Sequence, residues 1–216
     1  MRAILAGLML AACVPTAYAA SARPPRAEDG TQELAAPLNA QAYAEADALF
    51  AARAQDGATA RARELLEQAL KTSPLDAGLL WRYGRARVAT GEAHKGWGRG
   101  EHFVAAEQSA RAALDIDPDS VDARYWLAMA LYRRGKEADA LAEVDGALTR
   151  APRDARLWHL SGDIRARASK RAGGDRETAA RHYEKAADLY SQLGRKADAS
   201  AVRDALQRLQ DGQPRR

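Results

Sequence analysis

The sequence predicts an all-α protein made of repeated helix pairs, and two observations lead to this prediction. Alanine, the best helix former and a residue depleted in strands, supplies 52 of the 216 residues. The phrase Ala-Leu-x-x-x-Pro occurs three times, ending at Pro74, Pro118 and Pro152. The last two prolines are 34 residues apart, and the first two are 44 apart, which is the same period with ten extra residues. Such a period is typical of stacked helical repeats.

The positions around each proline predict where helices begin and touch. Two residues after the prolines stand good helix N-caps, namely Asp76, Ser120 and Asp154. Ten residues after them stand small residues, namely Gly84, Ala128 and Gly162. The repeat between the last two prolines predicts a helix over 121–134, a turn at Gly135 and a second helix over 138–148, each with one apolar face.

This pattern resembles the tetratricopeptide repeat (TPR) family, whose units place small residues at the contact of two helices and proline at the exit. The repeat that matches best does so at Leu127, Ala128, Leu131, Gly135, Ala140, Val144, Ala147 and Pro152. The preceding repeat matches at Leu80, Tyr83, Gly84, Gly91, Ala106, Ala110, Ala113 and Pro118, and the first at Leu49, Ala62, Leu66, Ala69 and Pro74 after a degenerate leading helix. The resemblance implies a right-handed solenoid over residues 41–211.

The remaining elements follow from the same pattern. The ten extra residues fall at 92–101, where a glycine-rich stretch breaks the helical pattern. The fourth repeat opens with Trp158 and Gly162, departs from the pattern over 169–175 and continues as a helix over 178–193. A final apolar stripe over 196–209 predicts a capping helix. The expected fold is therefore about four helix pairs and a C-terminal cap.

The first residues predict export. After Arg2, residues 3–12 are uncharged and apolar, too short a run to span about 30 Å of hydrocarbon but suited to a signal peptide. Cleavage after Ala19 is favoured by the segment length, giving a signal over 1–19. The alternative is a lipoprotein signal over 1–12, because the residues before Cys13 resemble a lipobox and would leave Cys13 lipidated.

Both alternatives place the chain in the periplasm, or on the outer membrane as a lipoprotein that faces the periplasm. Residues 20–40, with three prolines, are expected to be a flexible linker, and residues 212–216 a disordered tail. A single cysteine excludes an intramolecular disulfide and cysteine-based zinc or iron–sulfur sites.

In the TPR family the leading helices line a concave groove that binds peptides. Projected onto this sequence, the groove residues are Trp81, Arg85, Tyr125, Met129, Tyr132, Arg156, His159 and Asp163. Aromatic and arginine side chains suit recognition of a partner. The alternative is that the large side chains are core, which is favoured for Trp126 and Trp158 and stays open for Trp81, Arg85, Tyr125 and Tyr132.

The insertion presents Trp97 and Arg99 as further candidates for partner contact, since its glycines let the chain bend freely. His94, Glu101 and His102 match no metal-binding signature, so no metal is expected. Four cations at Arg165, Arg167, Lys170 and Arg171 could meet an anionic partner, or they could simply complement the end of a helix.

No motif for catalysis or a cofactor is present, so the sequence predicts no enzyme and no cofactor. The net charge of +4 does not indicate nucleic-acid binding, because the predicted export removes the usual targets and the charges alternate along the helices. The expected function is a scaffold that binds a protein or peptide of the envelope, with membrane contact only through the alternative anchor at Cys13.

A second resemblance supports a competing function. The stretch Leu80-Trp81-Arg82-x-x-Arg85-Ala86, followed by a loop, is similar to the regulator of microtubule dynamics proteins and to the T-components of TRAP transporters. This similarity implies a solute-binding accessory of a transporter as the alternative function. It requires a pocket near Arg82, Arg85 and the glycine-rich stretch.

Overall fold

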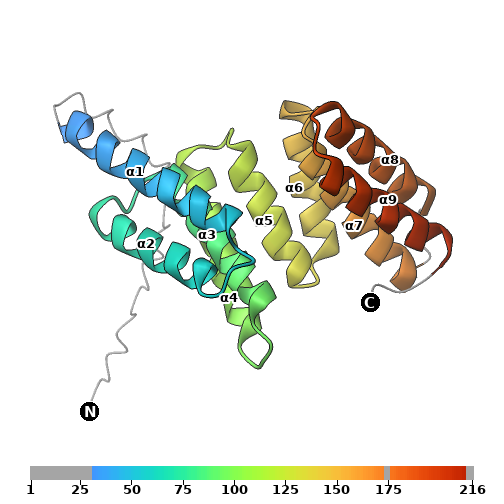
Figure 1. Cartoon of the computed structure of the whole chain (residues 1–216), viewed down its shortest axis with the longest axis horizontal. Coiled ribbons are helices and arrows are strands. Elements are labelled where there is room, and N and C mark those ends of the chain that lie inside the picture. Colours follow the sequence, from blue (N-terminus) through green and yellow to red (C-terminus); the bar gives the residue numbers. More distant parts are fainter. Residues whose placement is uncertain (1–30, 173–175, 213–216) are drawn as a thin grey trace, which may run out of the picture.

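The computed structural model describes residues 31–172 and 176–212, with side chains described for 39–169 and 176–212. Within these residues the chain forms only helices: α1 (Thr31–Ala51), α2 (Ala58–Thr72), α3 (Ala77–Ala93), α4 (Arg99–Ile116), α5 (Val121–Arg133), α6 (Glu137–Arg150), α7 (Ala155–Ala172), α8 (Arg176–Gln192) and α9 (Lys196–Gln210). They form four successive pairs and a final helix, which confirms the predicted all-α architecture (Figure 1). The predicted signal peptide, Cys13 and most of the predicted tail lie outside the described residues.

The predicted N-caps hold the leading helices. The Asp76 carboxylate accepts a hydrogen bond from the backbone N–H of Leu79 at 2.8 Å, and the Ser120 hydroxyl accepts one from Ala123 at 3.3 Å. Asp154 accepts one from Arg156 N–H at 2.9 Å. Each bond satisfies a donor that the first helical turn leaves without an intrahelical partner.

Small residues lie where paired helices touch, as predicted. A Cβ placed on Gly84 would lie 3.3 Å from the carbonyl oxygen of Ala106 in α4. A Cβ on Gly162 would lie 2.6 Å from Cδ1 of Tyr183 in α8, closer than real Cβ contacts come. The α7–α8 pair therefore packs at a distance that only glycine permits.

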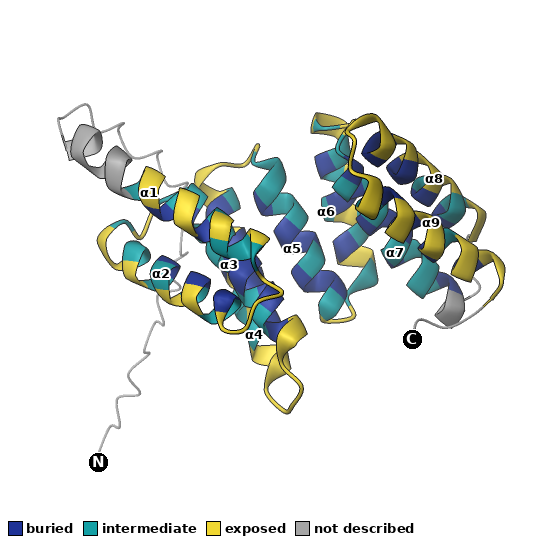
Figure 2. Ribbon diagram, in the orientation of Figure 1, coloured by how far each residue is buried: buried dark blue, intermediate teal, exposed yellow. Residues whose placement is uncertain are grey.

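The core runs between the helices of each pair and onward to the next pair, as the buried residues of Figure 2 show. The leading helices α1, α3, α5 and α7 each contact the next in that series. They therefore share one face of the molecule, on which side chains from distant repeats meet.

Two boundaries differ from the sequence predictions. The ten extra residues are mostly helical: α3 and α4 have 17 and 18 residues where α5 and α6 have 13 and 14, and their connection has five residues instead of three. Only His94–Gly98 is a loop, because the flanking residues gain helical hydrogen bonds and pack α3 against α4. Helix α1 begins at Thr31, inside the segment expected to be a linker.

The capping helix is confirmed, since α9 packs against α8 and buries Ala199, Val202, Ala205 and Leu209. In the part of the chain that the structure describes, no helix is both long and apolar enough to cross a membrane.

Candidate functional site

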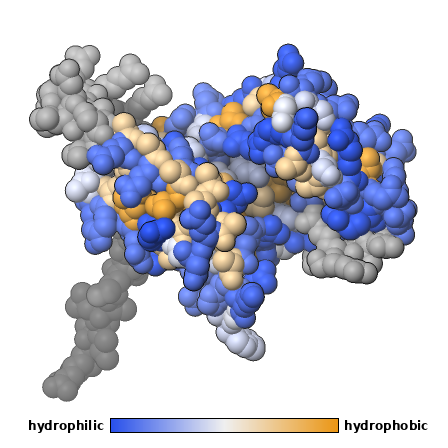
Figure 3. All heavy atoms as spheres, in the orientation of Figure 1, coloured by the Kyte–Doolittle hydropathy of each residue, from blue (hydrophilic) through white to orange (hydrophobic). Residues whose placement is uncertain are grey.

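A pocket of about 250 Å³ opens on the face shared by the four leading helices. It lies where Figure 3 shows the mostly hydrophilic surface hollowed near the centre of the view, over α5. The residues that line it come from the end of α1 and the turn after it, and from α3, α5 and α7: Phe50, Arg53, Val88, Ala89, Glu92, Tyr125, Trp126, Met129, Arg133, Arg156, His159, Leu160 and Asp163. We call it the concave pocket.

Aromatic rings form its floor. The ring of Trp126 packs edge-on against Phe50 at 5.5 Å and against Tyr125 at 4.9 Å between centroids. Trp126 is 8% exposed, which confirms its predicted place in the core. Met129 adds an unbranched side chain that adapts to irregular shapes. The floor can therefore take up a large apolar group.

The rim of the concave pocket is charged, and most of its charges are already paired. Arg133 forms an ion pair with Glu92 across α5 and α3. Arg156 binds Asp154 at 2.7 Å and Asp122 at 2.9 Å. Arg53 contacts only the carbonyl oxygen of Phe50, at 3.2 Å, and the Phe50 ring, so it has no carboxylate partner within the described residues. Arg53 can therefore receive an anionic group.

Tyr125 is the polar group best placed to meet a ligand. Burial raises the pKa of its phenol, and the negative charges of Asp163 and Asp154 act in the same direction. The Arg156 guanidinium lies 5.1 Å from the ring centroid. Because its pKa is raised, the phenol stays protonated. Among the described residues the Tyr125 hydroxyl has no hydrogen-bond partner, so it can donate a hydrogen bond into the pocket.

His159 and Asp163 lie one turn apart on α7, with His159 Nε2 4.0 Å from the Asp163 carboxylate. The same carboxylate accepts a hydrogen bond from the Tyr183 hydroxyl at 2.8 Å. Asp163 is thus held in place by α8 while it faces the pocket.

Five of the eight predicted groove residues meet here: Tyr125, Met129, Arg156, His159 and Asp163. Arg85, Tyr132 and Trp81 do not line the concave pocket. The sequence left open whether these side chains are exposed. Arg85 and Tyr132 are buried, with exposed fractions of 8% and 3%.

Arg85 is buried because α1 supplies its partners. Its guanidinium donates to the Asp47 carboxylate at 2.6 Å and lies over the Phe50 ring at 4.4 Å. Arg82 binds the same carboxylate at 3.0 Å and stacks on half-buried Trp81 at 4.2 Å. Both arginines that the alternative solute-binding function would assign to a ligand are therefore paired with the protein's own Asp47 carboxylate.

Tyr132 is covered from α7. The Arg167 guanidinium lies 3.6 Å from its ring centroid, and its hydroxyl donates to the carbonyl oxygen of Asp163 at 3.4 Å. Arg167 also binds Glu137 at 3.0 Å, and Arg165 binds Asp145 at 3.6 Å. These two cations of the predicted basic cluster are therefore paired within the fold.

The pocket residues not predicted from the sequence include Phe50 of α1, Arg53 of the turn that follows it, Glu92 and Arg133. The first helix departs from the repeat pattern, so no repeat position pointed to Phe50 or Arg53. Glu92 stood in the segment interpreted as an insertion. Trp158, expected in the core, is half-buried and donates a hydrogen bond to the carbonyl oxygen of Pro152 at 2.9 Å.

The loop between α3 and α4 is separate from the concave pocket. Trp97 is fully exposed there. The rings of His94 and His102 lie 5.8 Å apart, and among the described residues no group of three His, Cys, Asp or Glu side chains could hold a metal ion.

Comparisons with known proteins show which family and which solved structures this chain is similar to. Residues 42–186 match the family described as Regulator of microtubule dynamics protein 1-3. A comparison of the sequence with curated proteins gives no significant match.

Two solved structures share the architecture, each with a TM-score of 0.50. MamA (residues 41 to the end) from Desulfovibrio magneticus RS-1 is 16% identical and covers 81% of this chain and 98% of its own. TTC0263, a thermophilic TPR protein in Thermus thermophilus, is 21% identical and covers 81% of this chain and 87% of its own. The fold is therefore TPR-like.

Proposed function

The chain belongs to the regulator of microtubule dynamics protein 1-3 family, and we propose that it is a non-catalytic scaffold that binds a protein or peptide of the bacterial envelope in its concave pocket. The observation that supports this proposal is the composition of the pocket. An aromatic floor lies beside Arg53, which lacks a carboxylate partner among the described residues, and the Tyr125 hydroxyl, which lacks a hydrogen bond there.

The pocket favours a particular kind of peptide. A volume of about 250 Å³ is enough for one large apolar side chain, and the ring of Tyr125 and the side chain of Met129 lie ready to pack against it. Arg53 favours an acidic residue next to that side chain, because a guanidinium binds carboxylates well. Interfaces of this kind concentrate their binding energy in a few buried aromatic and arginine contacts.

The test is selection of peptides from a random displayed library against the full chain, followed by affinity measurements with variants. Met129→Glu places a carboxylate on the apolar pocket floor, where it would also compete with the peptide for Arg53, and should abolish binding of the selected peptides. Tyr125→Ala should weaken binding by about 1–3 kcal/mol. The matched control is Ile116→Glu, which introduces the same charge at a side chain that is 43% exposed at the end of α4, outside the pocket.

Circular dichroism of each variant checks that the helices persist. Peptides that bind the Met129→Glu variant as tightly as the unchanged protein would show that the concave pocket is not the recognition site.

The envelope location is a separate part of the proposal and needs its own test. Residues 1–40 fused to alkaline phosphatase should give active enzyme, because that enzyme is active only after export. Labelling with radioactive palmitate, compared between the unchanged chain and Cys13→Ser, distinguishes a lipid anchor from simple cleavage. An inactive fusion would contradict export.

A further inference from the structure

The loop His94–Gly98 leaves a large aromatic side chain without any packing. Trp97 is 103% exposed, so its ring makes essentially no contact with the rest of the protein. Tryptophan is highly buried on average, and an isolated ring in water gives up the free energy that burial would supply. The side chain is therefore available to a surface outside the chain.

The helices hold this loop away from the body. Glu107, eight residues after the start of α4, forms ion pairs with Arg134 and Lys136 at the α5–α6 turn. At 1.5 Å per residue, the start of α4 lies about 12 Å beyond that turn. Figure 1 shows the α3–α4 connection projecting past the neighbouring helices, and Figure 2 shows it exposed throughout.

The projection is a stiff element, not a loose loop. Phe103 of α4 is 2% exposed, and a Cβ on Gly91 of α3 would lie 2.8 Å from its ring, so the two helices meet closely at the base. At the tip, His94 Nε2 lies 2.9 Å from the carbonyl oxygen of Trp97 and closes the turn. A preformed turn loses little conformational entropy when it binds.

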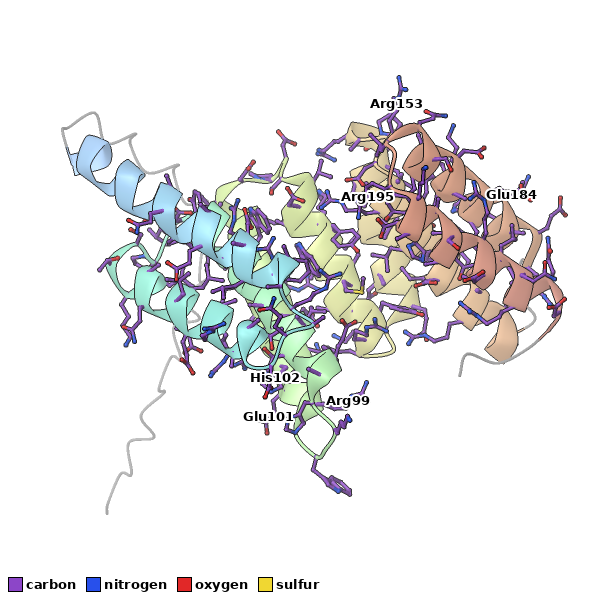
Figure 4. The ribbon with its side chains drawn as sticks, viewed as in Figure 1. Arg99, Glu101, His102, Arg153, Glu184 and Arg195 are labelled. Carbon is purple, nitrogen blue, oxygen red and sulfur yellow. The ribbon has the colours of Figure 1, made fainter. Side chains whose placement is uncertain are left out.

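The charges around Trp97 are mainly positive. Lys95 and Arg99 have no carboxylate partner among the described residues, whereas the nearby Glu92 is bound by Arg133. Figure 4 places Arg99 at the projecting end of α4, with the exposed Glu101 close by. Behind the tip, three cations share one buried carboxylate, since Arg111, Arg134 and Lys136 all contact Glu107.

We propose that this loop inserts Trp97 into the headgroup region of an anionic phospholipid bilayer, with Lys95 and Arg99 against the lipid phosphates. The amphipathic indole ring prefers the level of the headgroups, and each Lys or Arg near an anionic surface strengthens binding about fivefold. A projection of about 12 Å lets the ring reach that layer while the helical body stays outside it. This contact uses neither Cys13 nor the concave pocket, so it is independent of the proposed function.

The experiment measures quenching of tryptophan fluorescence by bromine atoms on the acyl chains of vesicles. The full chain is mixed with brominated vesicles of phosphatidylglycerol and phosphatidylcholine, or of phosphatidylcholine alone. Only tryptophan that reaches the bilayer is quenched, and comparison with Trp97→Ala separates the loop from the three other tryptophans. Quenching is expected on the anionic vesicles and is expected to disappear in Trp97→Ala.

Charge variants test the lipid class. Lys95→Gln with Arg99→Gln removes both cations and should lower the affinity that this quenching reports by about 30-fold. The matched control is Lys185→Gln with Arg208→Gln, two exposed cations of α8 and α9. Figure 4 shows Glu184, which precedes Lys185, far from the projecting loop. The control should quench like the unchanged chain.

Three results would overturn the proposal: no quenching on anionic vesicles, the same quenching in Trp97→Ala as in the unchanged chain, or equal quenching on neutral vesicles. The first of them would favour a protein partner for Trp97. None of them bears on peptide binding by Met129→Glu, so failure of this proposal is distinguishable from failure of the proposed function.

Discussion

Removing the Asp47 carboxylate is expected to destabilise the fold by leaving a buried cation without its partner. The Arg85 side chain is 9% exposed, and its one carboxylate contact among the described residues is with Asp47 at 2.6 Å. Breaking a fully buried ion pair from one side costs about 3–5 kcal/mol. Because the Asp47 side chain is 42% exposed, water reaches part of the site, and we expect about 2 kcal/mol for Asp47→Ala.

The measurement is urea unfolding followed by circular dichroism, with thermal unfolding as a second readout. A loss of about 2 kcal/mol corresponds to a fall of about 4–8 °C in Tm for a chain of this size. Combining Asp47→Ala with Arg85→Met should recover most of the loss, because an apolar side chain fits the site without a charge.

Asp119→Ala is the control for this prediction. It removes an ion pair with Arg150 in which the Asp119 side chain is 82% exposed, and the expected change is below about 0.5 kcal/mol. If Asp47→Ala is as harmless as Asp119→Ala, or if the effects at positions 47 and 85 simply add, the reasoning that Arg85 depends on Asp47 is refuted.

Two further predictions concern the packing and the charges of the fold. Gly162→Ala should lower the free energy of unfolding in urea by about 1–3 kcal/mol, because the new methyl group overlaps the ring of Tyr183. The control is Gly146→Ala, whose methyl group meets only one flexible side-chain atom at 3.7 Å and should raise the stability by about 0.5–1 kcal/mol. Equal effects of the two substitutions would contradict the close contact between Gly162 and Tyr183. Burial alone would raise the pKa of Glu107, but the hydrogen bonds from its arginine neighbours lower it below the usual value. Its contribution to stability is therefore full above the unfolded pKa of about 4.3 and lost as the pH falls through the lower folded pKa. Glu107→Gln should flatten the unfolding free energy over that acid range, and an unchanged pH profile would show that the carboxylate does not contribute.

The concave pocket could be predicted only in part from the sequence. The repeat pattern placed Tyr125, Met129 and Arg156 on corresponding faces of leading helices, and these three residues line the pocket. It could not include Phe50 and Arg53, since α1 departs from the repeat.

The sequence alone determined the helix pairs, because the signals for them are local or periodic. Proline spacing, N-caps such as Asp76 and Ser120, and small residues such as Gly162 act within one or two helices, so a pattern in the chain is enough to predict them.

Only the tertiary structure decided which of the side chains that the sequence predicts to be exposed have partners within the protein. Arg85 lies on a leading helix like Tyr125, yet Asp47 from α1, 38 residues away, binds it and buries it. A helical period gives the face on which a residue lies, but not the charge that another helix brings to that face. The same limit holds for Trp97, whose complete exposure depends on α3 and α4 extending past their neighbours.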